Sequence, residues 1–480
     1  MSHAYWEEQE HDPTGIVVVD NLPDRVFKPA PFQLEDLVTL SRLHNSANWS
    51  EMGAYKTTTG LWLADRSKWN RILIVTTRTG KTTYFETVPH LLPDYAFYNL
   101  TTQVCPDTRR LPQRCIVLAH YNLFTNRSPI LERLLNVYWD GVILDEAHRI
   151  KNHKGQWTKN IKKLRRGSSH IMTGTGFVNR PDEVWSLLNF VNPKMFSSYW
   201  RFRRTYCLEK EVPQRGISVV VGIKPEKQDE FREIVNSIGV RRLKREVLKD
   251  LPDTYETIIP VDLNTAQKRM YAEIKKELET LDQQGELLTS VNVLSQLSRL
   301  RQICVATPEV LEKRYDPKQE RMVTKVKLTE PSSKLDALME ILDGTDSKCI
   351  VFSNFTHPLQ LATTRLQRSG VSFIHLVVTD SDEQRAAKVN DFQRSGGPQV
   401  FLSTIPLGGE SITLTSASTV IFLDRSWSPA ANSQAIARAH RPGQKNAVQV
   451  IRIEARNTVD SYVNIRLTEK AGWFAKVFST

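Results

Sequence analysis

Short apolar runs recur in two separate series along this chain, and they constrain its fold more than any other feature. The first series begins near residue 71 and comprises RILIVTT, YAFYNL, CIVLAHYNLF, GVILDEAH and SSHIMTGTG. The second fills the last third with KCIVFSNF, VSFIHLVV, PQVFLST, STVIFLDRS and AVQVIRIEA. Runs of about four to eight apolar residues between amphipathic stretches are typical of buried parallel strands. The pattern therefore predicts an α/β fold with two parallel sheets.

A helical region separates the two series. Residues 223–300 have heptad-like apolar spacing around an extended ETIIPVDL piece, and the polar KRYDPKQERMVTKVKLTEPSSK after them predicts a surface loop or hairpin. With 480 residues the chain exceeds the roughly 250 to 300 residues at which single cores stop growing. We predict four parts: an N-terminal extension at 1–27, a first α/β lobe at 28–222, helical protrusions and a linker at 223–333, and a second α/β lobe at 334–480.

Charge and cysteine content narrow the class of protein. Lys and Arg number 65 against 53 Asp and Glu, a formal net charge of +12, which favours a polyanionic partner such as nucleic acid. The five cysteines are far apart and include no CxxC pair, so neither a zinc ribbon nor a disulfide framework is indicated. No stretch approaches the roughly 20 apolar residues of a membrane span. We expect a soluble intracellular protein without a membrane partner, in a bacterial or host cytoplasm or in a nucleus.

The strongest candidate for chemistry is the segment GVILDEAHRIKN, in which an apolar strand ends in Asp145 and Glu146. Open α/β folds bind ligands at the carboxyl ends of their parallel strands. Phosphoryl transfer needs one carboxylate to hold Mg²⁺ and a second group to orient the attacking water, and this pair fits both roles. An acidic pair at a strand end is otherwise a common solvated feature, so the flanking residues carry the prediction.

Several segments then resemble one known family in order. WDGVILDEAHRIKN and HIMTGTGFVNRPDEVWSLLNFVNP are similar to motifs II and III of the Swi/Snf-like ATPases of helicase superfamily two, the DEAH-box type. GVRRLKREVLKDLP resembles the segment that joins the lobes, LSRLRQIC the helical protrusion, and KCIVFSNFTHPLQ motif IV. FLSTIPLGGESITLTSASTVIFLDRSWSPAANSQAIARAHRPGQ resembles motifs V and VI. The resemblance covers roughly residues 28–470.

This resemblance implies two RecA-like lobes that use ATP and Mg²⁺ and that act on double-stranded or branched DNA, with the protein monomeric on DNA. With only about 27 residues in front of the motor, the chain is similar to minimal bacterial or phage members of the family. The resemblance also implies that Asp145 and Thr57 hold Mg²⁺.

Motif VI supplies candidates from the second lobe. In QAIARAHRPGQ, Arg438 and Arg441 are three residues apart, so on a helix both side chains project from one face. The match to the family pattern favours the arginine-finger role, in which they neutralise charge on the transferring phosphate, with Gln434 coupling nucleotide to lobe closure. The alternative is a basic helix face that contacts solvent or DNA.

Two segments compete for the phosphate loop. The segment TGKTT at 79–83 follows a strong strand, but it lacks the glycine that a complete GxxxxGK[ST] pattern requires. The segment EMGAYKTT at 51–58 resembles the family's DEMGLGKT and follows Gln33 of the Q-motif-like APFQLEDL. We predict that Lys56 binds the β- and γ-phosphates and Thr57 binds Mg²⁺, with further nucleotide contacts from Gln33, Gly53 and Thr58.

The same resemblance assigns a set of residues to DNA. Lys81 and Thr82 at a helix start can bind a DNA phosphate as readily as a nucleotide one. In the motif V stretch the hydroxyl of Thr404 and the glycines Gly408 and Gly409 permit close approach to a phosphate, unless those glycines only form a tight turn. The family match also puts Trp427 near the DNA or packed behind motif V.

The resulting functional prediction is a DNA-dependent ATPase that translocates on duplex DNA and remodels protein-DNA or branched DNA structures. One alternative within the enzyme class is a strand-separating or branch-migrating helicase. A second alternative, from another class, is a DNA-binding scaffold with a degenerate ATPase. Its motivation is a set of departures from the family pattern at Tyr55, Gly176, Ala437 and Ser411.

Overall fold

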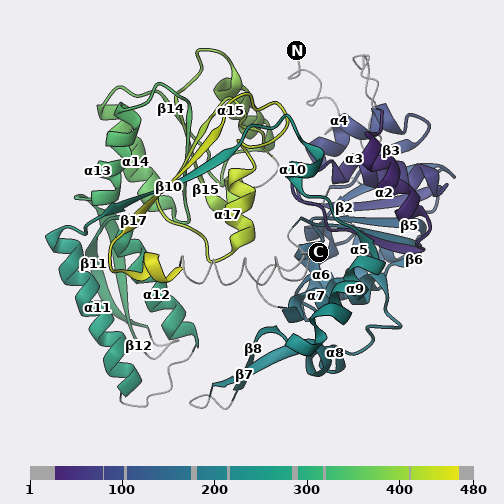
Figure 1. Cartoon of the computed structure of the whole chain (residues 1–480), viewed down its shortest axis with the longest axis horizontal. Coiled ribbons are helices and arrows are strands. Elements are labelled where there is room, and N and C mark those ends of the chain that lie inside the picture. The colour runs from purple at the N-terminus through teal and green to yellow at the C-terminus, as the bar shows by residue number, and fades with distance from the viewer. Residues whose placement is uncertain are drawn as a thin grey trace. The chain divides into compact units, whose positions relative to one another are not determined.

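The computed structural model describes residues 28–78, 80–101, 105–174, 181–212, 217–283, 290–316, 321–409 and 412–463. The chain divides into two compact units, Met1–Lys249 with Trp473–Thr480 and Asp250–Gly472. Figure 1 labels most of the helices and strands of each unit. The expected N-terminal extension at 1–27 lies outside the described residues, as do Gly176 and Ser411. No helix in the described ranges combines the length and the apolar character that a bilayer crossing requires.

The described part of the first unit is built on one parallel sheet with the strand order β3-β4-β2-β5-β6-β1-β9. Its strands are β1 (Asn45–Asn48), β2 (Arg71–Thr76), β3 (Ala96–Asn99), β4 (Cys115–His120), β5 (Tyr138–Asp145), β6 (Arg165–Met172) and β9 (Gly239–Val240). Its α-helices are α2 (Pro31–Ser41), α3 (Lys56–Arg66), α4 (Lys81–Leu91), α5 (Leu131–Asn136), α6 (Gln156–Lys162), α7 (Pro181–Val191), α8 (Tyr199–Tyr206), α9 (Gln228–Ser237) and α10 (Lys244–Val247). An antiparallel hairpin, β7 (Cys207–Val212) and β8 (Ile217–Ile223), follows α8.

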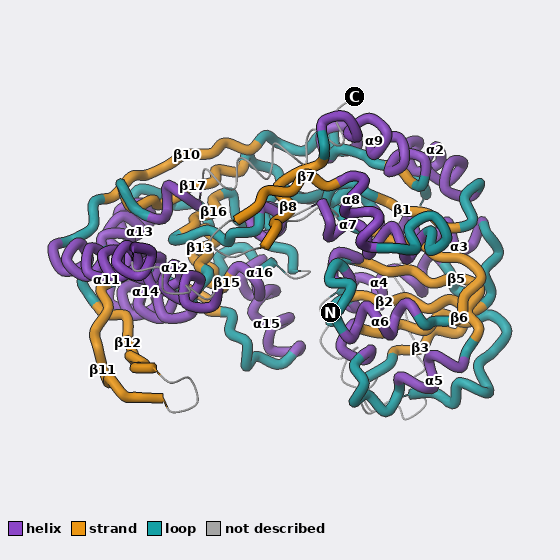
Figure 2. The backbone as a smooth tube through the Cα atoms, turned by 90° about the horizontal axis from the view of Figure 1, so that it is seen from below, coloured by secondary structure: helices purple, strands orange, loops and turns teal. Residues whose placement is uncertain are grey.

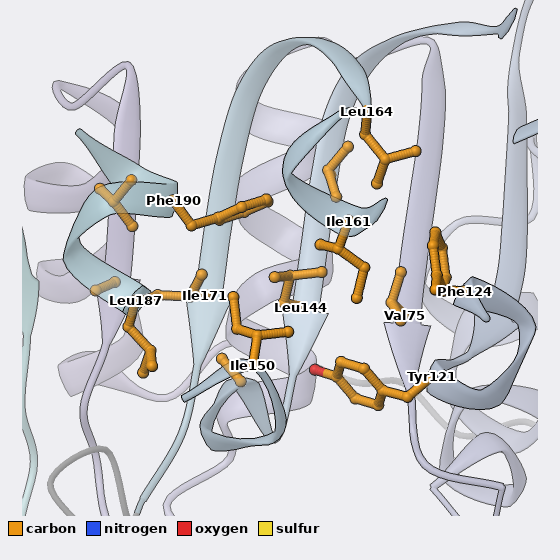
Figure 3. Packing of buried hydrophobic residues seen from close by; sticks show 14 of the residues in the cluster. Val75, Tyr121, Phe124, Leu144, Ile150, Ile161, Leu164, Ile171, Leu187 and Phe190 are labelled. Atoms are coloured by element: carbon orange, nitrogen blue, oxygen red, sulfur yellow. The ribbon is translucent and has the colours of Figure 1, made fainter. Parts of the chain in front are cut away.

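The apolar runs of this sheet are continuous because helices cover both of its faces. Successive side chains of a strand point to opposite faces, and in β5 Val142 and Leu144 join one core cluster while Ile143 joins another. Figure 3 shows Leu144 with side chains of neighbouring strands and of the helical layer that covers this face, where Ile161 and Phe190 lie. A half-exposed sheet would instead require alternating polar residues.

The described part of the second unit contains a parallel sheet with the strand order β10-β17-β16-β13-β15-β14. Its strands are β10 (Thr254–Val261), β13 (Cys349–Ser353), β14 (Phe373–His375), β15 (Val400–Thr404), β16 (Thr419–Phe422) and β17 (Val448–Ala455). Its α-helices are α11 (Thr265–Gln283), α12 (Ser290–Val305), α13 (Ser333–Asp343), α14 (Thr356–Arg368), α15 (Asp382–Gln393), α16 (Ile405–Gly408) and α17 (Pro429–Ile436). Strand β13 alternates in the same way, since Val351 and Phe352 enter different clusters.

The polar segment expected as a loop or hairpin is a hairpin of β11 (Thr307–Asp316) and β12 (Arg321–Thr329). Figure 2 shows it as a two-stranded ribbon separate from the parallel sheet. The region 223–333, expected between the lobes, is divided between the two units. Strand β9 pairs with β1 of the first sheet, whereas β10 pairs with β17 of the second, so the division falls between Lys249 and Asp250.

The prediction of an α/β chain with two parallel-sheet lobes is thereby confirmed. Strand β1, with the sequence NSAN, was not predicted, because three of its four residues are polar. It forms at the position between β6 and β9, where both of its edges are paired. Long-range pairing, rather than local strand propensity, stabilises this strand.

Candidate active site

The carboxyl ends of β2 and β5 are adjacent, and the last residues of the two strands are hydrogen-bonded to each other. The hydroxyl of Thr76 donates to Oδ2 of Asp145 at 2.9 Å. The backbone N–H of Glu146 donates to Oδ1 of the same carboxylate at 3.0 Å. The Asp145 carboxylate is thus held at the edge of the sheet where open α/β folds bind ligands.

Electrostatics make this edge a candidate cation site. Burial, followed by repulsion from Glu146, raises the pKa of Asp145 to about 6, against the lowering effects of the Thr76 hydroxyl and the Lys56 ammonium. The electrostatic effect of Lys56 means that the predicted phosphate-loop lysine and the predicted Mg²⁺ ligand belong to one site. Two neighbouring carboxylates with hydroxyl groups beside them provide the hard oxygen ligands that Mg²⁺ prefers.

Two buried tyrosines also contact this site, and neither was among the predicted site residues. Tyr121, which directly follows β4, donates its hydroxyl to the backbone oxygen of Asp145 at 2.6 Å. Figure 3 shows its ring in the core and its hydroxyl directed toward β5. Tyr84 on α4 is completely buried, and burial, followed by the charge of Asp145, raises its pKa well above its ordinary value. The position of Tyr121 directly after a strand is a sequence signal for a site residue. Nothing in the local sequence distinguishes Tyr84 from an ordinary aromatic residue of the core.

Glu146 connects the ends of β5 and β6. Its backbone has φ 50° and ψ 47°, the left-handed region that few residues other than glycine adopt. The Glu146 carboxylate lies 3.2 Å from Nδ1 of His148, and that nitrogen lies 3.5 Å from the hydroxyl of Thr173, which directly follows β6. Backbone strain of this kind clusters at functional sites, which supports a functional role for Glu146.

The segment at 51–58 connects β1 with α3, which is the strand-loop-helix arrangement of a phosphate loop. Gly53 has φ 85° and Tyr55 has φ 53°. A side chain at Gly174 would come within 3.1 Å of the backbone nitrogen of Met52, so this glycine allows the end of β6 to approach the loop closely. The predicted loop therefore lies at the same edge of the sheet as Asp145.

Lys56, Thr57 and Asp145 are brought together at this edge. The ammonium of Lys56, 9% exposed, donates to the backbone oxygens of Ser50 at 2.9 Å and Glu51 at 2.8 Å. Those carbonyl groups accept hydrogen bonds that the ammonium could otherwise donate to a phosphate. Thr57 lowers the pKa of the buried Tyr84 hydroxyl and Asp145 raises it, so both side chains lie near this hydroxyl.

Lys81, from the competing segment, is directed elsewhere. It begins α4 and is 7% exposed, and its ammonium donates to Oδ1 of Asn99 at 2.7 Å and to the backbone oxygen of Leu100 at 2.5 Å. Thr82 is exposed at the same helix start. In this arrangement Thr82 is accessible to a DNA phosphate and the Lys81 ammonium is not, so a DNA contact of Lys81 stays a prediction that requires its side chain to turn outward.

Gln33 contacts the loop through its threonines. Its amide Nε2 donates to the hydroxyls of Thr58 at 3.0 Å and Thr59 at 2.9 Å, and its Oε1 accepts from the backbone N–H of Ala30 at 3.0 Å. These bonds attach α2 to the start of α3. A contact of Gln33 or Thr58 with the nucleotide stays a prediction.

Arg242, in the segment GVRRLKREVLKDLP, was not among the predicted site residues. Its backbone N–H donates to the hydroxyl of Ser50 at 2.9 Å, and its guanidinium forms an ion pair with the buried Asp36 at 2.8 Å. Arg242 therefore connects α2, the start of the phosphate loop and the segment that leads out of the first unit.

In the second unit the expectation that Arg438 and Arg441 share a helix face is wrong. Helix α17 ends at Ile436, and both arginines lie in the turns after it. The proline at 442 disfavours helical backbone at the residue before it. Both guanidinium groups nevertheless donate to the backbone oxygen of Ile412 at 3.3 Å, and Arg441 also donates to the hydroxyl of Thr413 at 2.8 Å. Tertiary contacts therefore bring the pair together.

Gly408 and Gly409 of the motif V stretch are required by packing within the second unit. A side chain at Gly408 would lie 2.5 Å from the Phe352 ring, and one at Gly409 would lie 2.8 Å from the backbone oxygen of Ile405 and 3.8 Å from Cβ of Gln434. Gln434 on α17 thus lies beside α16. Thr404, 9% exposed, precedes this helix. Close packing thus restricts both positions to glycine, whereas the tight-turn alternative and the expected DNA contact of these residues stay predictions.

Replacing Gly408 with alanine is expected to destabilise the protein by roughly 1–3 kcal/mol, because the added methyl group overpacks the core against Phe352. Gly344→Ala is the matched control, since its side chain would meet backbone oxygens only at 3.5 Å and 3.7 Å. Thermal unfolding of the full chain measures both. Normal stability of Gly408→Ala combined with weaker DNA binding would instead favour the DNA contact.

Trp427 packs inside the second unit. Its ring lies 6.1 Å from that of Tyr462 and under the guanidinium of Arg301, which is 5.6 Å from the ring centroid. Arg301 comes from α12 and forms a buried ion pair with Asp424 at 3.0 Å. These contacts hold Trp427 against α12 and Tyr462, and its expected position near the DNA or behind motif V stays a prediction.

Comparison with known proteins places these features in a family. Residues 56–309 match the SNF2-related domain, and residues 333–443 match the helicase conserved C-terminal domain. The chain belongs to the SNF2-related family, and it carries the pair of domains with which members of this family hydrolyse ATP.

The relatives include eukaryotic and bacterial proteins. An ISWI chromatin-remodeling complex ATPase of Arabidopsis thaliana is 30% identical over 69% of this chain and 30% of its own length. An uncharacterised ATP-dependent helicase of Mycoplasma pneumoniae is 30% identical over 67% of this chain and 29% of its own length. The chain thus spans less than a third of these two relatives. The SWI2/SNF2 ATPase core of Sulfolobus solfataricus, solved in complex with dsDNA, is 23% identical with a TM-score of 0.42, over 98% of this chain and 94% of that one.

Proposed function

We propose that this chain is a DNA-dependent ATPase that translocates on double-stranded DNA and thereby remodels protein-DNA or branched DNA structures. One observation carries the proposal: the Lys56 ammonium and the Asp145 and Glu146 carboxylates interact at one edge of a parallel sheet, in a chain of the SNF2-related family. A positive group for phosphate and carboxylates for metal and water are recurring parts of sites that transfer phosphoryl groups.

The residues of the first unit fit Mg-ATP chemically. Lys56 donates to loop carbonyl groups that a phosphate group can replace, and the N–H groups at the start of α3 favour an anion. Thr57 and Asp145 would hold Mg²⁺, which neutralises negative charge on phosphate oxygens when bound. A divalent cation would also relieve the repulsion between Asp145 and Glu146.

We assign separate roles to the remaining candidates. Glu146 orients and polarises the attacking water, with His148 at 3.2 Å restricting its carboxylate. Arg438 and Arg441 supply positive charge to the transferring phosphoryl group, after exchanging the Ile412 carbonyl for a phosphate oxygen. Gln434 couples nucleotide binding to closure of the lobes.

Support for DNA as the partner comes from the family and from charge. The relatives named above include a chromatin-remodeling ATPase and an ATP-dependent helicase, and the chain has a formal net charge of +12. Affinity that rests on backbone phosphates does not depend on base sequence. The exposed Thr82 and, in the second unit, Thr404 are the proposed contacts.

Duplex DNA is expected to stimulate ATP hydrolysis more than single-stranded DNA or RNA, and the chain is expected to displace the third strand of a triplex without unwinding a duplex. Steady-state ATPase rates with each nucleic acid, followed by both strand assays, measure this. DNA affinity should also fall steeply with salt, by roughly 10³-fold between 50 and 200 mM for about six phosphate contacts.

Two results would redirect the proposal. Unwinding of a forked duplex without triplex displacement favours the strand-separating or branch-migrating alternative. A second candidate function, a DNA-binding scaffold with a degenerate ATPase, is favoured by Tyr55, which takes the place of a family glycine in the phosphate loop at φ 53°. Background hydrolysis at saturating duplex DNA, with normal DNA binding, would establish that function.

A further inference from the structure

Tyr55 is an unusual residue at an unusual position. It is the residue directly before Lys56, its φ and ψ are 53° and 31°, and it forms the N-cap of α3 without a capping hydrogen bond from its side chain. Side chains rarely adopt this left-handed backbone, which glycine adopts freely. Strain of this kind is typically retained at sites where the side chain serves a function.

The Tyr55 side chain is presented to solvent rather than packed into the core. It is 41% exposed, although most large apolar and aromatic side chains of this unit are buried. Its ring meets the ring of Phe32 with centroids 6.4 Å apart and planes tilted by 41°. Phe32 lies in the first turn of α2, directly before Gln33, and is itself partly exposed. Two aromatic rings therefore form a continuous accessible surface beside the predicted phosphate loop.

Hydrogen bonds fix the position of this aromatic surface relative to the loop. The backbone oxygen of Tyr55 accepts from the hydroxyls of Thr58 at 2.9 Å and Thr59 at 3.0 Å. The same two hydroxyls accept from Nε2 of Gln33, the neighbour of Phe32. The first turns of α2 and α3 are thus joined, and both rings are attached to that joint.

We propose that Tyr55 and Phe32 stack on the base of the bound nucleotide, so that Tyr55 determines affinity for the nucleoside part and not for the phosphates. This inference rests on the proposed assignment of residues 51–58 to the phosphate loop. Stacking on an aromatic ring is available to every base, and it needs no hydrogen-bond partner from the ring. The tyrosine thereby supplies a contact that glycine at this position cannot.

The test compares a ligand that has a base with one that has none. ADP carries a base and phosphates, whereas inorganic tripolyphosphate carries phosphates alone. The dissociation constants of both, with Mg²⁺ present, are measured by calorimetry on the full chain. Tyr55→Ala and Tyr55→Gly are expected to weaken ADP binding about tenfold relative to tripolyphosphate, as loss of a stacking contact does. Tyr55→Phe is expected to leave the ratio of the two constants unchanged.

Tyr138→Ala is the matched control. Tyr138 is also exposed, at 51%, but it begins β5, at the opposite end of that strand from Asp145. The ratio of the two constants should therefore stay unchanged in this variant. Thermal unfolding of each variant verifies that it folds.

The outcomes separate this inference from the function on which it rests. Lys56→Ala is expected to weaken both ligands. If it weakens neither, the assignment of the phosphate loop fails, and the stacking proposal fails with it. If Lys56→Ala weakens both but the Tyr55 variants shift ADP and tripolyphosphate equally, or if Tyr55→Gly tightens ADP binding, the ring does not stack on the base and only this inference is overturned.

Discussion

Changing Glu146 to glutamine is expected to lower DNA-stimulated ATP hydrolysis by about 10²- to 10⁴-fold, the range for loss of a general base. The amide keeps the size of the side chain but cannot accept the proton of the attacking water. Because Lys56, Thr57 and Asp145 are unchanged, nucleotide binding should persist. Steady-state ATPase assays at saturating duplex DNA, together with ADP binding, measure the two effects separately.

Glu132→Gln is the control for this experiment, because Glu132 is an exposed carboxylate on α5 of the same unit. It should hydrolyse ATP at the normal rate. If Glu146→Gln retained full activity, the water-orienting role would have to pass to another group at the ends of β5 and β6, such as His148.

Lys56→Ala is expected to lower ATPase activity, whereas Lys81→Ala is expected to lower stability and leave the activity of the folded protein unchanged. Loss of the Lys56 ammonium removes a donor to the transferring phosphate and should reduce hydrolysis by about 10²-fold or more. Loss of the Lys81 ammonium removes its hydrogen bonds to Asn99 and Leu100, which should lower the melting temperature while hydrolysis per folded molecule persists. ATPase rates and thermal unfolding of both variants give the comparison.

Lys163→Ala, at an exposed position that follows α6, controls for the loss of one positive charge. Loss of hydrolysis only in Lys81→Ala would reverse the assignment of the two segments and make 79–83 the phosphate loop. Loss in both variants would show that Lys81 also supports the nucleotide site, through the strand end that its ammonium contacts.

Local sequence predicts the two sheets well because burial on both faces of a strand demands an unbroken apolar run. The segments around Leu144 and Val351 meet that demand and were predicted as strands. Strand β1 was missed because its residues are polar, and the helical geometry expected of Arg438 and Arg441 was wrong because α17 ends before them. Neither feature is decided by residues close in sequence.

The sequence by itself determined the fold class and the principal acidic pair, since the period of apolar residues and the abrupt change to Asp145 and Glu146 are local properties. Only the tertiary structure decided where the two lysines point, that Tyr84 and Tyr121 surround Asp145, and that the Tyr55 ring lies beside Phe32. The reason is physical: a strand responds to the burial of its own faces, whereas the direction of a long side chain depends on which hydrogen-bond partners distant segments provide.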